Sequence, residues 1–297
     1  PPCLPEVTAG SRVLVTGTGA SSGPARYLAS LLAAGGPGAR FVPLSSFAPG
    51  SPRPDGDVLI VFSQHLSPNA RLALAARDAY RACLLVTSAT EVVAGVHAVR
   101  LPPEDERGTL LRVVGPAVAL LAAALFARGL GVGLDFAPLG RVPELVAAAR
   151  ARAADLAPAF ADRDAPIAVV TAGDHAAAYR AVTWKLLEGW RIAEPFAWDV
   201  MEIVHGPFQQ FADHPLTVLS LEAADDGERD LFERLDRVLV PARHRHVRVA
   251  SSLPRHLAIL EHDAITTELL LSGLRERPRD LLVPDTPADA PLYGMGA

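Results

Sequence analysis

Lysine is almost absent from this chain of 297 residues: Lys185 is the only lysine among 28 lysine and arginine residues. Lysine and arginine are not equivalent at a tight site, because lysine carries a compact charge on a flexible stem and arginine a planar fork. A single lysine retained on a predicted helix is therefore a candidate functional residue. The alternative is that its retention is an accident of composition.

Cysteine is nearly as scarce. Cys3 and Cys83 lie in dissimilar contexts and indicate no disulfide framework, so we expect a reducing compartment, the cytoplasm. The start of the chain also lacks the charged region and apolar core of a signal peptide. No spacing of cysteine and histidine is typical of a metal site, so no metal is predicted.

Long hydrophobic runs are missing too. The longest lies between Arg112 and Arg128, falls short of the roughly 20 residues of a bilayer span, and contains Gly115 and Pro116. It predicts a buried core helix within 110–136. The net charge of −5 gives no general attraction for nucleic acid or anionic membranes, so neither is expected as a partner. The local basic cluster "RHRHVR" is interpreted as a solvated strand edge.

Apolar runs and helical periodicities alternate through the first half of the chain. Strands are predicted at 12–17, 58–63 and 82–88, with weaker candidates at 39–44 and 97–102. Helices are predicted at 24–35 and 69–81, where apolar residues recur every three and four positions. Such alternation is typical of a parallel sheet with helices on both faces.

The same plan begins again after a further helix at 143–157. Strands are predicted at 166–173, 216–222 and 246–251, and helices at 176–193, 227–240 and 257–277. We interpret the chain as α/β, with two tandem doubly wound parallel-sheet modules that have helices on both faces. The predicted domains are 1–159 and 160–297.

The loop "VTGTGASSG" (15–23) joins a predicted strand to a helix. It does not fit the dinucleotide fingerprint, because Ser22 stands at the third glycine position and no acidic residue ends the next strand. No cofactor is therefore predicted. The loop's backbone N–H groups and the hydroxyls of Thr18, Ser21 and Ser22 suit a phosphate or polyol at a helix N-terminus. A plain tight turn is the alternative.

The loop "FSQHLSPN" (62–69) has a similar arrangement. Ser63 and Gln64 lie at the carboxyl end of a predicted strand, where ligands of doubly wound sheets bind. These two side chains are predicted to face the first loop. Ser67 is a further candidate substrate ligand. Its alternative role is the N-cap of a helix, with Pro68 at the first helical position.

The segment "TWKLLEG" (183–189) precedes "MEIVHGP" (201–207), and "GTGAS" and "SQ" follow strands. Together these motifs resemble the double sugar-isomerase (SIS) domain family. The likeness is to the isomerase part of glutamine–fructose-6-phosphate aminotransferase and to related phosphosugar isomerases and deaminases, and it covers nearly the whole chain. It implies two flavodoxin-like SIS modules, a sugar-derivative substrate and a homodimer.

The resemblance also implies roles for individual residues. Glu188 matches the enolising base, which moves a proton between adjacent carbons of an open-chain sugar, and Lys185 matches a lysine beside it. His205 matches a histidine that helps to open the ring and comes from the neighbouring subunit, which implies a shared active site. Further substrate ligands are matched by Thr18, Ser63 and Gln64.

Helix geometry would place Lys185 beside Glu188, since residues three apart on a helix are neighbours. A nearby ammonium would hold the carboxylate or stabilise an enediolate. The alternatives are a surface salt bridge for Lys185 and Glu188, and a helix-terminal or core histidine for His205.

Two departures from the family pattern bear on the substrate. The second phosphate loop of the family reads S-x-S-G-x-T, but here His65, Leu66 and Pro68 replace a serine, the glycine and the threonine. The family's C-terminal catalytic lysine has no counterpart, because Val283 stands there. The substrate's anionic group is therefore different or absent, or His65 contacts it instead. The predicted function is a sugar or sugar-phosphate isomerase or deaminase-like enzyme. The alternatives are a non-catalytic sugar-binding protein and an enolising enzyme for a substrate other than a sugar.

Overall fold

The computed structural model describes residues 7–8, 10–106, 108–161, 165–173, 176–190, 196–211, 216–239 and 244–282. Val283 and Cys3 lie outside the described residues. The described chain divides into two compact units. The first comprises the described residues up to Leu134 together with Leu282, and the second comprises those of Asp135–Leu281. The domain boundary near residue 160 stays a prediction.

The first unit contains a five-stranded parallel sheet. Its strands are β1 (Arg12–Thr16), β2 (Gly38–Phe41), β3 (Val58–Phe62), β4 (Ala82–Thr87) and β5 (His97–Arg100), in the order β2-β1-β3-β4-β5. Every residue of β3 and of β4 is buried. Such continuous apolar strands need cover on both faces of the sheet.

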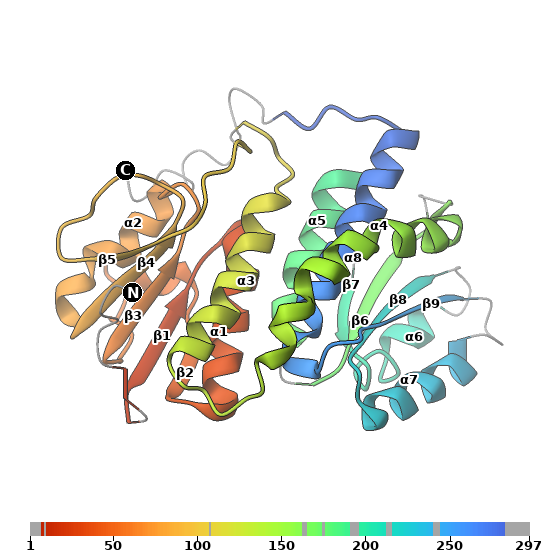
Figure 1. Ribbon diagram of the computed structural model, residues 1–297, viewed down its shortest axis with the longest axis horizontal. Coiled ribbons are helices and arrows are strands. Elements are labelled where there is room, and N and C mark those ends of the chain that lie inside the picture. The colour runs from red at the N-terminus through yellow and green to blue at the C-terminus, as the bar shows by residue number, and fades with distance from the viewer. Residues whose placement is uncertain are drawn as a thin grey trace. The chain divides into compact units, whose positions relative to one another are not determined.

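Three helices provide this cover: α1 (Ser22–Gly35), α2 (Pro68–Ala75) and α3 (Val114–Gly129). Helices α1 and α3 pack together on one face and α2 lies on the other (Figure 1). On the α2 face, Ala70 and Leu74 pack with Leu59 and Val61 of β3 in one apolar cluster. This packing brings the N-termini of the helices to the carboxyl edge of the sheet.

The second unit contains a four-stranded parallel sheet. Its strands are β6 (Ile167–Thr171), β7 (Phe196–Asp199), β8 (Thr217–Glu222) and β9 (Arg245–Ala250), in the order β7-β6-β8-β9. This order repeats that of the first four strands of the five-stranded sheet. Its helices are α4 (Val142–Leu156), α5 (Arg180–Trp190), α6 (Pro207–Gln210), α7 (Asp226–Leu239) and α8 (Arg255–Glu276). Helix α8 packs against α4 and α5, and α7 packs on the opposite face.

The main elements agree with the sequence predictions, with differences at their ends. The apolar helix predicted within 110–136 begins at Val114, and Gly131, with φ +71°, follows its end. Strand β7 was not predicted, although β2 and β5 are equally short. Its four residues include an alanine and an aspartate, which are depleted in strands. The basic cluster was interpreted as a solvated strand edge. Its residues from Arg245 onward lie on β9, the edge strand of its sheet, but His244 and the His246 side chain are buried, so the cluster is only partly solvated. None of the helices in the described chain is long and apolar enough to cross a membrane.

Three consecutive polar residues at the centre of α8 are buried: Glu261, His262 and Asp263. Glu261 is paired with Arg152 of α4 and accepts a hydrogen bond from Ser251 Oγ at 2.8 Å. Because consecutive helical residues point in different directions, the three have different partners, and α8 is surrounded by protein at this level.

The burial of the His262 side chain predicts that the stability of the protein depends on pH. Its Nδ1 lies 2.8 Å from the Tyr179 hydroxyl and its Nε2 lies 3.0 Å from the Val249 carbonyl. Burial lowers the pKa of His262 from 6.5 to about 4. The unfolded chain therefore binds the proton first, so stability is lost as the pH falls from about 6.5 to about 4. The expected loss is about 3 kcal/mol.

Urea unfolding at pH 7, 6, 5 and 4 measures this loss. The variant His262→Gln should flatten the dependence, whereas His97→Gln, at an exposed position, should keep it. An unchanged pH slope in His262→Gln would contradict the assignment.

Candidate functional site

The predicted site residues divide between the two units. Three of them, Lys185, Glu188 and His205, lie in the second unit. The first unit holds Thr18, Ser21, Ser22, Ser63, Gln64, His65 and Ser67.

The loops that follow β1 and β3 are in contact. A Cβ at Gly17 would lie 2.6 Å from the Ser21 carbonyl oxygen and 3.2 Å from that of Phe62, so glycine is required for this close approach. The Thr18 carbonyl accepts the N–H of Ser21 at 3.1 Å, which closes the turn before α1. The sheet therefore brings Thr18 and Ser63 to one edge, as the strand order predicts.

The hydroxyls of Ser63 and Ser67 organise their own loop. Ser67 donates its N–H to Ser63 Oγ at 3.0 Å, and Ser67 Oγ accepts the N–H of Ala70 at 3.3 Å. Pro68 occupies the first position of α2. Ser67 is thus the N-cap of α2, the alternative that its sequence context offered.

Gln64 lies at the centre of this edge. Its carbonyl accepts hydrogen bonds from the Thr87 hydroxyl and the Ser88 N–H, both at 2.9 Å. Its side-chain Nε2 is buried and has no hydrogen-bond partner within the described part of the chain. The amide packs against Gly115 so closely that a Cβ there would lie 1.4 Å from Nε2. A buried donor without a partner suits an oxygen atom of a bound ligand.

Two glutamates that sequence analysis missed lie beside these loops. Glu104 Oε1 is 2.6 Å from His65 Nε2, and only 4% of the Glu104 side chain is exposed. Glu106 accepts the N–H groups of Val113 and Val114 at 2.8 Å and that of Gly115 at 3.0 Å. Both follow β5 in an irregular segment, which carries no periodic signal that could have identified them.

Lys185 is buried, with 4% of the residue exposed. Its Nζ donates to Asp263 Oδ1 at 2.7 Å and to Thr267 Oγ1 at 3.0 Å. The surface salt bridge considered for this lysine is therefore wrong. Its partner Asp263 was not predicted, because it is 78 residues away in the sequence.

Glu188 is half-buried in the last turn of α5. The helix is held close to α8 at this level, because a Cβ at Gly189 would lie 2.5 Å from the Leu270 side chain. Trp190 Nε1 also donates to the Leu270 carbonyl at 3.2 Å. The position of Glu188 is thus set by the close packing of α5 against α8.

His205 is exposed in the turn before α6. Its backbone N–H donates to the Glu202 carbonyl at 3.0 Å, and Gly206, with φ +132°, follows it. A core histidine, one of the alternatives for this residue, is therefore wrong. Its side chain is accessible to other molecules.

A serine, a histidine and an aspartate form a separate chain of contacts in the second unit. Ser220 Oγ is 2.7 Å from His246 Nε2, and His246 Nδ1 is 2.8 Å from Asp236 Oδ1. Burial lowers the pKa of His246. Ser220 is completely buried within β8, so this order of groups stabilises the sheet and offers no accessible nucleophile.

Comparison with solved structures identifies the fold. Glucosamine-6-phosphate deaminase from Thermotoga maritima has a TM-score of 0.73 at 15% identity, with 92% of this chain and 88% of that chain covered. The C-terminal domain of glucosamine-fructose-6-phosphate aminotransferase from Francisella tularensis has a TM-score of 0.71 at 12% identity, with 93% and 88% covered. The chain has the fold of sugar-phosphate isomerases and deaminases.

A third structure with this fold is tagatose-6-phosphate ketose/aldose isomerase from Escherichia coli. Its TM-score is 0.66 at 17% identity, with 93% of this chain and 86% of that chain covered. No protein-family model matches the chain, and no curated protein matches its sequence. The resemblance indicated by the "KLLEG" and "HGP" motifs is confirmed for the isomerase and deaminase fold.

Proposed function

We propose that this protein is a sugar isomerase or deaminase-like enzyme, and that Glu188 moves a proton between adjacent carbons of an open-chain sugar derivative. The observation that carries the proposal is the half-buried Glu188 on α5, a helix fixed against α8 by the buried Lys185–Asp263 pair. A general base acts efficiently when its position is fixed and it is partly removed from water.

The proposed reaction begins when the Glu188 carboxylate removes the proton from the carbon next to the sugar carbonyl. The bond electrons form an enediol, or an enolamine when the substrate carries an amino group at the reacting carbon. The protonated Glu188 then returns the proton to the neighbouring carbon. In the same sequence the hydroxyl proton of the carbon that was deprotonated passes to the former carbonyl oxygen, so the isomerisation balances with no cofactor or metal. While the enediol is present, the proton held by Glu188 exchanges with solvent, which introduces deuterium from D₂O.

The loops after β1 and β3 are proposed to bind the oxygen atoms of the sugar. The donors are the buried Gln64 amide and the hydroxyls of Thr18 and Ser63. Ser21 and Ser22 are proposed as further ligands, and His65 as a neighbour of the ligand. Ser67 is needed for the start of α2 and contributes through the shape of the loop.

His205 is proposed to assist ring opening in a neighbouring subunit, so that two copies of the chain form a homodimer with shared active sites. Its exposure is consistent with this role, because a side chain that acts on another subunit must be accessible on its own. Cytoplasmic localisation remains part of the proposal.

Lys185 is proposed as a positioning residue. Two of the three donors of its ammonium group are engaged by α8, through Asp263 and Thr267. It therefore acts on Glu188 indirectly, by fixing the rotation of α5 about its own axis and its position along α8.

Proton exchange with solvent tests the proposal. The protein is incubated in D₂O with aldoses, ketoses, amino sugars and their phosphates, and deuterium at C1 and C2 is followed by NMR. We expect deuterium at one of these carbons in at least one substrate. Binding of a sugar with no deuterium in any of them would favour the sugar-binding protein instead.

A further inference from the structure

We propose that the N-terminus of α3 and the amide of Gln64 form an oxyanion-binding site. The Glu106 carboxylate occupies this site from within the chain until the phosphate or carboxylate group of a small molecule displaces it. The inference goes beyond the proposed function, because it concerns the binding of an anion and does not depend on proton transfer by Glu188. All of the residues that carry it lie in the first unit.

The first N–H groups of α3 converge on one carboxylate. Glu106 Oε1 accepts those of Val113 and Val114 at 2.8 Å, and Oε2 accepts that of Gly115 at 3.0 Å. The next residue, Pro116, has no N–H to donate. An anion at the start of a helix is stabilised by such N–H groups and by the helix dipole. The two oxygen atoms of Glu106 therefore have the position and the charge of an oxyanion ligand.

The Gln64 side chain is an independent indication that this site is built for more than Glu106. Gln64 is 8% exposed, and its Nε2 has no hydrogen-bond partner in the part of the chain that the structure describes. The amide lies directly against Gly115, since a Cβ there would be 1.4 Å from Nε2. Leaving a buried donor without an acceptor costs free energy. An oxygen atom of a ligand bound beside Gly115 would satisfy this donor, which the oxygen atoms of Glu106 do not.

Glu106 is a tethered group whose carboxylate can leave the helix. Its backbone is fixed, because its N–H donates to Glu104 Oε2 at 2.6 Å and its carbonyl accepts the Thr109 hydroxyl at 2.9 Å. The residue is only half-buried, so rotation about its side-chain bonds returns the carboxylate to water while the segment keeps its conformation. A carboxylate that regains water carries no large desolvation penalty. An external oxyanion therefore displaces Glu106 at a modest cost.

A purely structural role for Glu106 is the alternative, because a carboxylate that caps a helix has the same geometry. Capping and competition predict different results when the carboxylate is removed. A competitor that occupies the site about nine-tenths of the time lowers the apparent affinity of an external oxyanion about tenfold. Removal of a competitor therefore increases this affinity, whereas removal of a cap only weakens the start of the helix.

Calorimetric titration of the full chain tests the inference. The probes are inorganic phosphate, fructose 6-phosphate and glucuronate, with fructose as the neutral reference. We expect Glu106→Ala to bind at least one of the three oxyanions about tenfold more tightly than the wild type does, and to show no gain for fructose. Inorganic phosphate distinguishes a free anion from a sugar phosphate, and glucuronate distinguishes a carboxylate from a phosphate.

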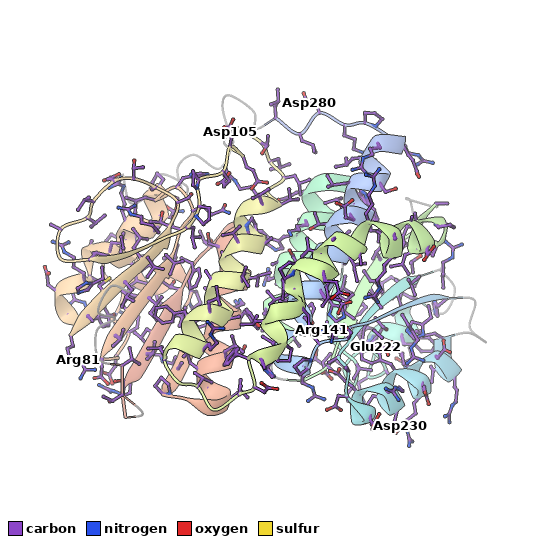
Figure 2. All side chains as sticks on the ribbon, in the orientation of Figure 1. Arg81, Asp105, Arg141, Glu222, Asp230 and Asp280 are labelled. Carbon is purple, nitrogen blue, oxygen red and sulfur yellow. The ribbon has the colours of Figure 1, made fainter. Side chains whose placement is uncertain are left out.

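Asp105→Asn is the matched control for charge, since Asp105 is exposed in the same segment (Figure 2). Its oxyanion affinities should stay within about twofold of the wild type, because salt and water screen an exposed charge. Glu106→Gln is the second variant if Glu106→Ala does not fold. A neutral amide is a weaker acceptor than a carboxylate, so this variant should show a smaller gain of the same sign.

Gly115→Ala tests the contribution of the Gln64 amide. The three atoms nearest to the added Cβ all belong to the end of the Gln64 side chain, so the amide has to move away from the helix. Combined with Glu106→Ala, this change should cancel most of the tenfold gain. Gly129→Ala is the control at the other end of α3, where an added Cβ meets nothing within 4 Å, and it should leave the gain intact.

Three results would overturn the inference. An oxyanion affinity that is unchanged or lower in Glu106→Ala, or no oxyanion binding in any variant, would leave Glu106 as a helix cap only. An equal gain in Asp105→Asn would attribute the effect to net charge. A gain that survives Gly115→Ala would remove Gln64 from the site. None of these measurements involves deuterium exchange, so this inference and the proposed function can fail separately.

Discussion

Replacing Lys185 by methionine is expected to lower the free energy of unfolding by about 3–5 kcal/mol, because it leaves a buried charge without its partner. Asp263 is 2% exposed, and the Lys185 ammonium lies 2.7 Å from its carboxylate. Water cannot replace the lost partner at this depth. Chemical denaturation at pH 7 measures the loss directly.

The double variant Lys185→Met/Asp263→Leu isolates the pair. Removing both charges should recover most of the lost stability, since buried ion pairs can often be replaced by apolar residues at little net cost. Arg180→Met is the control on the same helix, because Arg180 is exposed, and its effect should be below about 1 kcal/mol. A single variant as stable as the wild type would contradict the role of the pair.

The same double variant distinguishes a positioning role from a catalytic one. If Lys185 only fixes α5, deuterium exchange should return together with stability. If its ammonium touches the substrate, exchange should remain lost in a well-folded protein. We expect Lys185→Arg to lower the free energy of unfolding and to reduce deuterium exchange. The reason is that a planar guanidinium is larger than the ammonium that fits between Asp263 and Thr267.

Replacing Glu188 by glutamine is expected to reduce deuterium exchange by about 10²–10⁴-fold, the usual contribution of a general base. The amide has nearly the shape of the carboxylate but cannot accept the proton. Since Glu188 is half-buried at the end of α5, the fold and the sugar affinity should persist. The measurement is the exchange rate at C1 and C2, with calorimetric titration as the test of binding.

Glu233→Gln is the matched control, because it makes the same change at an exposed position of α7. It should exchange at the wild-type rate. Persistent exchange in Glu188→Gln would show that another group moves the proton and would remove the central residue of the proposed function.

The sequence contains enough information to predict the sheets, because their strands are short apolar runs between glycine-rich turns. β3 and β4 are fully buried and therefore show the continuous pattern of a parallel sheet. β7 has only four residues, and its pairing with β6 depends on the tertiary structure. The equally short β2 and β5 were predicted, so length alone does not explain why β7 was missed.

Candidate site residues could be predicted where a sequence motif contains them, but the contacts between residues that are distant in the sequence could not be predicted. Gln64 was identified because it leaves a strand, but its contact with Gly115 joins residues that are far apart in the sequence. The pairing of Lys185 with Asp263 spans 78 positions, and a single sequence carries no signal for it. Glu104 and Glu106 resemble ordinary solvated loop residues until the fold places them beside His65 and α3.

Because Lys185 is buried, its chemical modification would report the separation of α5 from α8. Because this is the only lysine, a lysine-directed acylating reagent has one side-chain target, and that target is shielded between α5 and α8. Peptide mass spectrometry of the acylated residue would therefore count the molecules in which these two helices have separated, with no engineered label.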